Sequence, residues 1–237
     1  MQGETMEKKF KYEIIYFCIM AALSGVMIGI GGTASLLANA LLGAQGKLIG
    51  SLLFSLGIFA IIAFEMNLFT GMVSKIPTMG AKNYWKLAVC FICNILGVAF
   101  VAILVYFTPL RDTVQIQARS IAEAKLVADG GAWVLRSLCS SILCGILITL
   151  SVWSVKYAPK KGLSATVGAI FPIVVFAFCG FDHSVANMLY FYFYGQVSWL
   201  MIGYILISMI GNIIGGVLVP LAALFKEKML KDNESAE

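Results

Sequence analysis

Six long hydrophobic runs dominate the 237-residue sequence. A run of about 20 apolar residues is long enough to cross the ~30 Å hydrocarbon core of a bilayer as a helix. Only 12% of the residues are charged, about half the share found in an ordinary soluble domain. We therefore predict an all-α integral membrane protein with six transmembrane segments, at residues 14–42, 48–80, 83–108, 132–155, 162–192 and 197–225.

These segments leave little of the chain for a second domain. We predict one membrane domain at residues 14–225, with short terminal segments at 1–13 and 226–237. The first run is longer than a signal-peptide core and leads into further membrane segments, so we expect it to be retained rather than cleaved.

The basic residues indicate a membrane topology. Cytoplasmic loops of membrane proteins are enriched in lysine and arginine. Both termini are therefore predicted to be cytoplasmic, as an even number of spans requires, and the net charge of +5 is ascribed to this bias rather than to nucleic-acid binding. With this topology 12 of the 17 basic residues are cytoplasmic: Lys8, Lys9, Lys11, Lys75, Lys82, Lys86, Lys156, Lys160, Lys161, Lys226, Lys228 and Lys231.

Two segments are interrupted by polar residues near their middles. The second contains Glu-Met-Asn-Leu-Phe-Thr at residues 65–70, and the fifth contains Gly-Phe-Asp-His-Ser-Val-Ala-Asn at residues 180–187. Non-helical backbone at membrane depth is tolerated only where protein buries it or where it lines a cavity. Interruptions at matching places in two halves of a chain point to a substrate pathway near the bilayer midplane.

The two halves of the chain correspond in order. Asn94-Ile-Leu-Gly97 in the third segment is echoed by Asn212-Ile-Ile-Gly215 in the sixth, 118 positions later. Three segments per repeat is an odd number, so the second copy has to be inverted in the membrane. We predict an inverted repeat with copies at about 14–108 and 132–225.

His183 is the only histidine and the leading candidate for a pore centre. An ionisable residue at membrane depth is costly and usually serves a pathway. The alternative, which is compatible with the first role, is a neutral histidine that ties two half-helices together. Thr70 is the natural partner of His183 if the inverted repeats bring the two interruptions together, although its hydroxyl could instead bond only to its own helix.

Glu65 and Asp182 are the only acidic residues well inside the hydrophobic segments, and the order of the halves pairs them at an offset of 117. They could form an acid/base pair, but we expect each to cap a half-helix or to accept from exposed amides. The same order pairs Asn67 with His183 at an offset of 116. Further polar support is expected from Asn94, Asn187 and Asn212.

Apolar residues beside the interruptions are candidates for hydrophobic constrictions, or else for packing: Ile58, Leu68, Phe69 and Phe176. Lys125 stands before the fourth segment, where its charge would attract anions unless it is only a solvated residue. The Cys90-x-x-Cys93 pair is interpreted as packing, because it lies on one apolar segment without a second pair. We predict no metal, no cofactor and no catalytic residue.

These motifs resemble the formate/nitrite transporter family. Its two discontinuous helices carry a Leu-Phe-Thr loop and a Gly-Phe-[Glu/Asp]-His-Ser-[Ile/Val]-Ala-Asn-Met loop, which stand here at residues 67–71 and 180–188. Two departures favour the hydrosulfide branch of the family. Asn67 replaces the usual acidic residue, and Gly145 follows Cys144 where an asparagine is common. Further matches extend the resemblance over residues 14–225: residues 28–32, 54–57, 83–85, 94–97 and 211–216.

The resemblance implies an aquaporin-like fold and a homopentamer in a bacterial inner membrane, with one pore per protomer. It also implies transport of small monovalent anions of weak acids, namely formate, nitrite or hydrosulfide. By position, Thr70 and His183 match the family's central pair, and Lys125 matches its vestibule lysine. Its constrictions are matched by Ile58, Leu68, Phe69 and Phe176.

A simple magnitude favours one mechanism. Moving a bare anion into a medium of low dielectric constant costs of order 20 kcal/mol, whereas protonating a carboxylate of pKa about 3.7 at pH 7 costs about 4.5 kcal/mol. We hypothesise that basic vestibules attract the anion, that it crosses the constrictions partly or wholly as the neutral acid, and that His183 assists or gates its passage.

Two other functions are weaker alternatives. An aquaporin-like channel for neutral solutes would share the fold, but the sequence lacks paired Asn-Pro-Ala motifs. A membrane subunit of a redox complex could bind haem or quinone, but a single histidine cannot supply bis-histidine haem ligation.

Overall fold

The computed structural model describes residues 2–127, 129–157 and 162–234, and within these residues the regular structure is entirely helical. Three short 3₁₀ helices are η1 (Gly43–Gln45), η2 (Val73–Thr78) and η3 (Ala81–Asn83). The α-helices are α1 (Gln2–Leu41), α2 (Gly46–Ala63), α3 (Phe69–Met72), α4 (Trp85–Tyr106), α5 (Arg111–Lys125), α6 (Ala132–Tyr157), α7 (Leu163–Cys179), α8 (Asn187–Tyr194) and α9 (Trp199–Glu234).

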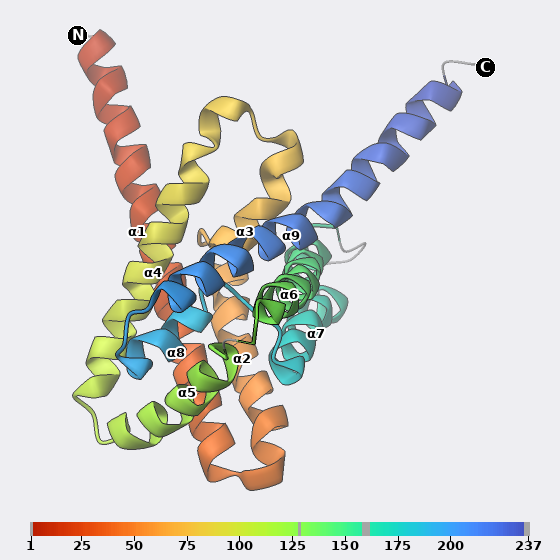
Figure 1. Ribbon diagram of the computed structural model, residues 1–237. Coiled ribbons are helices and arrows are strands. Elements are labelled where there is room, and N and C mark those ends of the chain that lie inside the picture. The colour runs from red at the N-terminus through yellow and green to blue at the C-terminus, as the bar shows by residue number, and fades with distance from the viewer. Residues whose placement is uncertain (1, 128, 158–161, 235–237) are drawn as a thin grey trace.

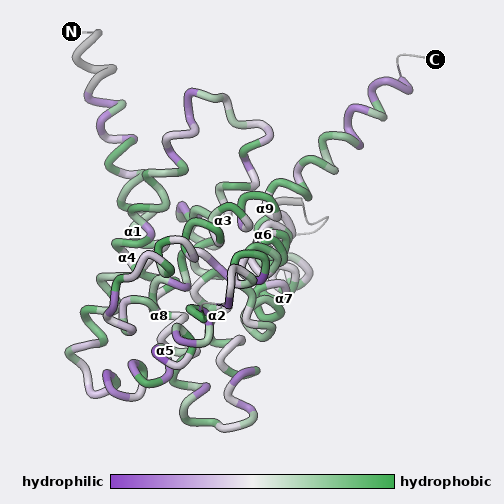
Figure 2. Tube along the Cα trace, viewed as in Figure 1, coloured by the Kyte–Doolittle hydropathy of each residue, from purple (hydrophilic) through white to green (hydrophobic). Residues whose placement is uncertain are grey.

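The described helices form a multi-pass membrane protein. Helices α1, α2, α4, α6 and α9 are long and apolar enough to cross a bilayer, and α7 is a shorter apolar helix of 17 residues. Hydrophobic residues cover the middle of the molecule, whereas hydrophilic residues concentrate at the two projecting helix ends and along α5 (Figure 2). The prediction of six membrane segments, two of them interrupted, is confirmed.

The two ends of the chain project from the same side of the molecule, opposite α5 and the α1–α2 hairpin (Figure 1). This arrangement agrees with an even number of spans. The predicted limits at residues 13/14 and 225/226 fall inside continuous helices, since α1 begins at Gln2 and α9 ends at Glu234. The predicted cytoplasmic residues Lys160 and Lys161 lie outside the described residues.

Close helix packing follows the same pattern in the two halves. Helix α1 packs on α4, and α6 packs on α9. Gly97 of α4 lies against the Ala22 carbonyl, as Gly215 of α9 lies against the Ile142 carbonyl, and a Cβ on either glycine would collide with that backbone. Small residues allow such close approach between membrane helices. The structure thus contains the predicted inverted repeat.

The two interruptions align differently from the prediction. Met66 N–H donates to the Ile61 carbonyl at 2.8 Å, and Phe181 N–H donates to the Phe176 carbonyl at 3.0 Å. Each bond closes a Schellman turn at a helix end. The two donor residues lie 115 positions apart in the sequence, and so do the two acceptor residues. Position 65 therefore corresponds to position 180.

With this alignment, Asn67 corresponds to Asp182 and Leu68 to His183. The predicted pairings of Glu65 with Asp182 and of Asn67 with His183 are wrong. The reason is that the segment between the interruption and the supporting asparagine differs in length between the two halves. Asn67 precedes Asn94 by 27 residues, whereas Asp182 precedes Asn212 by 30, so one offset cannot hold throughout the repeat.

Helix α5 joins the two repeats. Val114, Ala118 and Ala122 recur every four residues and are buried against neighbours that include α8 and α1. The opposite face carries charged residues, as expected for an amphipathic helix at a surface. The last residue of α5 is Lys125, so the packing of this helix fixes where that lysine stands.

We expect Gly97→Ala to lower the free energy of unfolding by about 1–3 kcal/mol, because the added methyl group forces α4 away from α1. Thermal unfolding in detergent would show this as a lower melting temperature. Gly80→Ala is the matched control, since nothing lies within 4 Å of a Cβ at Gly80. Equal melting of the two variants would contradict the prediction.

Candidate functional site

Two asparagines satisfy the backbone of the two interruptions. In the first half, the Asn94 side-chain amide donates to the carbonyls of Ala21, at 2.7 Å, and Asn67, at 2.9 Å. Its carbonyl accepts the N–H of Phe69 at 2.8 Å. One side chain on α4 therefore joins α1 to the two residues that flank Leu68 in the first interruption.

Asn212 of α9 makes the equivalent contacts in the second half. Its amide donates to the carbonyls of Ser141, at 2.9 Å, and Asp182, at 2.8 Å. Its carbonyl accepts the N–H of Ser184 at 2.9 Å. Both asparagines are fully buried, so each supplies hydrogen bonds that water would otherwise have to supply.

These supports bring His183 and Thr70 together from opposite halves of the chain. Nε2 of His183 lies 2.9 Å from Oγ1 of Thr70, and both residues are at most 1% exposed. The backbone N–H of Ala186 donates to Nδ1 of His183 at 3.1 Å. An amide can only donate, so Nδ1 carries no proton. The neutral ring therefore donates from Nε2 to the threonine oxygen.

The hydroxyl proton of Thr70 is then left to donate elsewhere. Putting a second proton on His183 would place an N–H opposite the N–H of Ala186 and break that hydrogen bond. The geometry therefore holds a neutral histidine at the centre of the molecule.

Aromatic rings surround the histidine on one side. The Phe176 ring stacks on the His183 ring, with centroids 5.8 Å apart, and meets the Phe54 ring edge-on at 5.6 Å. Phe54 and Phe176 are each 3% exposed. Phe54 begins one of the motifs that resemble the family, but the sequence did not predict it as a constriction residue.

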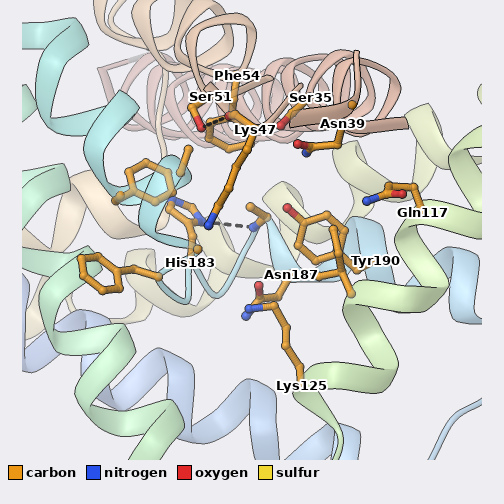
Figure 3. A pocket seen from close by; sticks show the side chains of 17 residues that line it. Ser35, Asn39, Lys47, Ser51, Phe54, Gln117, Lys125, His183, Asn187 and Tyr190 are labelled. Atoms are coloured by element: carbon orange, nitrogen blue, oxygen red, sulfur yellow. Dashed lines mark hydrogen bonds between the residues drawn. The ribbon is translucent and has the colours of Figure 1, made fainter. Parts of the chain in front are cut away.

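A cavity of about 330 Å³ is lined by these rings and by His183 but not by Thr70, and we name it the Lys47 cavity. Its lining includes Lys47, Lys125, Phe54, Phe176 and His183. Lys47 reaches over the cavity from the start of α2, and Lys125 comes from the end of α5 (Figure 3). The volume would hold roughly ten waters, so a hydrated anion could enter.

A second cavity, of about 530 Å³, is lined from the other end of α2, and we name it the Glu65 cavity. Its lining includes Ile58, Ile61, Leu68, Glu65 and Lys75. Ile58 and Leu68 are the predicted constriction residues here, and Ile61 is the repeat counterpart of Phe176. Ile58 lies one helical turn beyond Phe54, so the closed region between the cavities is short.

The structure does not place Phe69 in either lining. Its ring packs on the Phe91 ring of α4, with centroids 5.0 Å apart. The reason is that Phe69 is tied by its backbone to Asn94, which turns this residue toward α4.

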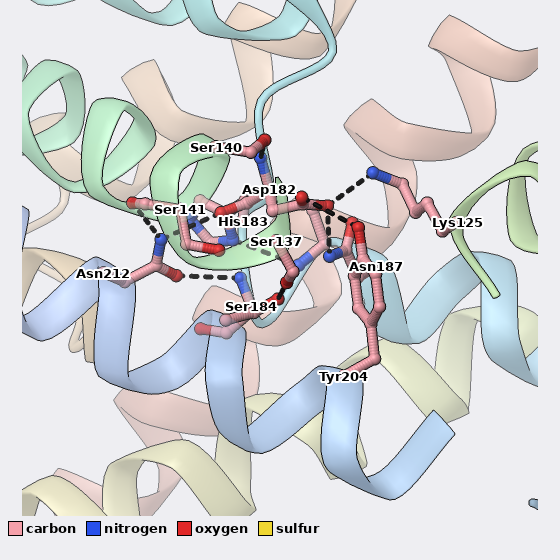
Figure 4. A network of polar contacts seen from close by, with 12 residues as sticks. Lys125, Ser137, Ser140, Ser141, Asp182, His183, Ser184, Asn187, Tyr204 and Asn212 are labelled. Atoms are coloured by element: carbon pink, nitrogen blue, oxygen red, sulfur yellow. Dashed lines mark hydrogen bonds and ion pairs between the residues drawn. The ribbon is translucent and has the colours of Figure 1, made fainter. Parts of the chain in front are cut away.

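The Asp182 carboxylate is the centre of a buried polar network (Figure 4). Oδ1 accepts from Lys125 Nζ at 2.5 Å and from Asn187 Nδ2 at 3.0 Å, and Oδ2 accepts from Tyr204 at 2.8 Å. The expectation that Asp182 caps a half-helix or accepts from backbone amides is therefore wrong. Its partners are side chains, because α5 brings a lysine within reach.

Glu65 behaves differently from Asp182. It is exposed and is the only described non-glycine residue with a positive φ, of 51°. Its backbone forms part of the Schellman turn that ends α2. Contrary to our expectation, its side chain does not cap the half-helix α3. Asn67 lies next to the same cavity and donates weakly to the Phe17 carbonyl at 3.4 Å.

Lys47 is a charged residue of the candidate site that sequence reasoning missed. Lys125 is neutralised by Asp182, and the ion pairs found among the described residues do not include Lys47. The Lys47 ammonium lies 5.2 Å from the centroid of the Phe178 ring. A signal was available, because few basic residues fall on the side opposite the termini.

Among the residues that the structure describes, no group of three or more histidine, cysteine or acidic side chains is placed to hold a metal ion. What comes together instead is a buried hydroxyl–imidazole pair between two cavities of different charge. Such a pair can exchange hydrogen bonds with a small solute that reaches it.

Comparisons with known proteins agree with this geometry. A family model described as "Formate/nitrite transporter" matches residues 2–225. The chain is 29% identical over 231 residues to "Uncharacterized transporter YrhG" of Bacillus subtilis (strain 168), covering 90% of this chain and 85% of that protein. It is 28% identical over 262 residues to "Probable formate transporter" of Methanothermobacter thermautotrophicus, covering 95% and 93%.

The fold also matches a solved structure. "Pentameric formate channel with formate bound" superposes with a TM-score of 0.74 at 20% identity, covering 93% of this chain and 99% of that chain. This likeness confirms the predicted fold class, an all-helical membrane protein with an aquaporin-like inverted repeat.

We expect Lys125→Met and Asp182→Asn each to destabilise the protein by about 3 kcal/mol, because each leaves a buried partner uncompensated. The double variant should recover most of this loss, and a double-mutant cycle of melting temperatures would measure the coupling. Arg136→Met is the control, since its ion pair with Asp129 is open to solvent and such pairs contribute little to stability. Additive losses in the double variant would argue against the pair.

Proposed function

The chain belongs to the formate/nitrite transporter family, whose members are channels and transporters rather than enzymes, and we propose that it conducts small monovalent anions of weak acids. The contact between Thr70 and His183, buried between two cavities, is the observation that carries this proposal. Family membership leaves no support for the alternative of a redox-complex subunit.

The proposed route runs from the Lys47 cavity to the Glu65 cavity. An anion collects first beside Lys47, whose charge no described ion pair offsets. It then passes Phe54, Phe176 and His183, and leaves past Ile58, Ile61 and Leu68. Apolar rings at a constriction exclude hydrated ions, because an ion would have to shed its water there.

We propose that the solute crosses this dry region as the neutral acid. It takes a proton from solvent in the Lys47 cavity and returns one to solvent in the Glu65 cavity. The cost of protonating a weak acid is several kcal/mol, against of order 20 kcal/mol for a bare ion at low dielectric constant. The neutral His183 ring is a poor proton donor. Its role is to orient Thr70, whose free hydroxyl proton can bond to the passing solute.

The identity of the transported anion is a separate and more specific proposal. The names of the Methanothermobacter relative and of the solved channel point to formate. Asn67 and Gly145, which depart from the family pattern, favour hydrosulfide. A Cβ at Gly145 already meets the Asn212 backbone, which explains why no asparagine side chain stands there in this chain.

We also propose the assembly and its orientation. The solved relative is named as a pentameric channel, which supports a homopentamer with one pore per protomer and residues 14–225 as its channel domain. The distribution of lysines supports termini on the cytoplasmic side, and the resemblance to the family supports the inner membrane of a bacterium. The apolar outer faces of α4 and α9 suit both lipid and neighbouring protomers.

In proteoliposomes, we expect saturable flux of formate, nitrite or hydrosulfide and at least about tenfold slower flux of strong-acid anions of similar size, such as nitrate or chloride. The reason is that only a weak acid can cross as a neutral molecule. Stopped-flow measurement of each ion separately checks this. Equal rates for nitrite and nitrate would contradict the mechanism, and glycerol flux alone would favour the neutral-solute channel.

We expect Thr70→Val to reduce weak-acid flux by about tenfold, because it removes the hydroxyl while preserving shape and leaves the His183 N–H unpaired. Thr70→Ser is the matched control and should keep most of the flux. His183→Ala should also change the flux. If the Val and Ser variants conduct equally, the hydroxyl has no part in conduction.

A further inference from the structure

Glu65 stands in a backbone conformation that does not suit its residue type. Its φ of 51° is left-handed, a region that glycine adopts freely and that other residues adopt at a cost. Its N–H donates to the Ile62 carbonyl, and the next N–H, of Met66, donates to Ile61. The turn itself requires only a residue that tolerates a left-handed φ.

The other half of the chain provides an internal comparison. At the end of α7 the same turn is made with Gly180, whose φ is 77°. Gly180 donates to the Ala177 carbonyl, and Phe181 donates to Phe176. The fold thus builds one turn twice, once with the favoured glycine and once with a glutamate. Nothing in the turn requires a carboxylate, so the reason for a glutamate at this position has to lie in the surroundings of its side chain.

Glu65 lines a cavity of the proposed pathway. Glu65 is exposed and lines the Glu65 cavity, where Lys75 is the other charged lining residue. It also lines a neighbouring cavity of about 500 Å³ together with Glu13 and Lys86. In the Glu65 cavity, therefore, the acidic and basic lining residues balance.

The Lys47 cavity differs in its charge. Its charged lining residues are Lys47 and Lys125, and Asp182 neutralises only Lys125. One end of the pathway is therefore electropositive, whereas the other is close to neutral because of Glu65. The inverted repeat would place equivalent turns at both ends, so this single residue creates much of the difference.

We propose that Glu65 makes conduction directional, by lowering the capture of anions at its own end of the pathway relative to the Lys47 end. The inference rests on the proposed anion conduction. A passive channel cannot change the equilibrium distribution of its solute. It can, however, require a higher anion concentration on one side than on the other to reach half of its maximal flux, because fixed charge sets the local anion concentration.

The test uses vesicles sorted into two orientations by capture on a C-terminal tag, so that anion can be offered from either side. Initial formate and hydrosulfide fluxes are measured against concentration for the full-length protein. For the wild type, we expect a higher half-saturating concentration on the Glu65 side than on the Lys47 side.

Two substitutions separate charge from backbone strain. Glu65→Gln removes the charge and keeps the strained turn, whereas Glu65→Gly removes both. Both should lower the half-saturating concentration on the Glu65 side by about three- to tenfold, the effect of one unit charge at the mouth of an aqueous cavity. The value on the Lys47 side should stay within about twofold. Glu65→Gly should melt no lower than the wild type.

Two controls complete the design. Glu227→Gln removes an exposed acidic residue of α9 that lines neither cavity, and it should change nothing. Lys47→Gln should raise the half-saturating concentration on the Lys47 side only.

The outcomes are distinct. If the wild type conducts but neither Glu65 variant shifts the Glu65-side value, or if only the glycine variant does, the directional role is overturned. If the wild type carries no weak-acid anion from either side, the proposed function fails and this inference falls with it. A shift shared by both Glu65 variants and absent from Glu227→Gln supports the proposal.

Discussion

The backbone of two broken helices has to find hydrogen-bond partners inside a membrane, and the rest of the structure depends on how this is done. Unpaired amides cost several kcal/mol each in hydrocarbon. Asn94 and Asn212 meet this requirement with three bonds each, two to carbonyls and one from an amide. Since each asparagine also reaches across to α1 or α6, the interruptions become rigid parts of the helix packing.

The equivalence of the two supports explains the form of the pathway. The residue that follows the supported carbonyl is Leu68 in one half and His183 in the other, and both face the centre. The residue that opens each Schellman turn is Ile61 or Phe176, and each lines its own cavity. One fold applied twice thus supplies two cavity linings, and the chemical differences between them come from substitutions at equivalent positions. His183 is such a substitution, and Glu65 in place of glycine is another.

Parts of the site followed from the sequence because they are local. The composition of the interruptions, the lone histidine and its contact with Thr70 were all predictable, and Ile58, Leu68 and Phe176 do line the two cavities. The alignment of the two halves was not, because residue likeness between Glu65 and Asp182 suggested an offset of 117, and the hydrogen bonds show 115. Phe69 was misplaced for a related reason, since its direction is set by a bond to Asn94.

The sequence by itself determined that the chain spans a membrane six times, that two spans are broken and that the halves repeat, because hydropathy and helix length are properties of contiguous residues. Only the tertiary structure decided which charged residues line the cavities and which of them are paired. Lys125 and Asp182 lie 57 residues apart, and α5 brings them within 2.5 Å, so that Lys47 keeps the uncompensated charge. Charge pairing over such separations depends on how helices pack, and a linear sequence does not specify which side chains those helices bring together.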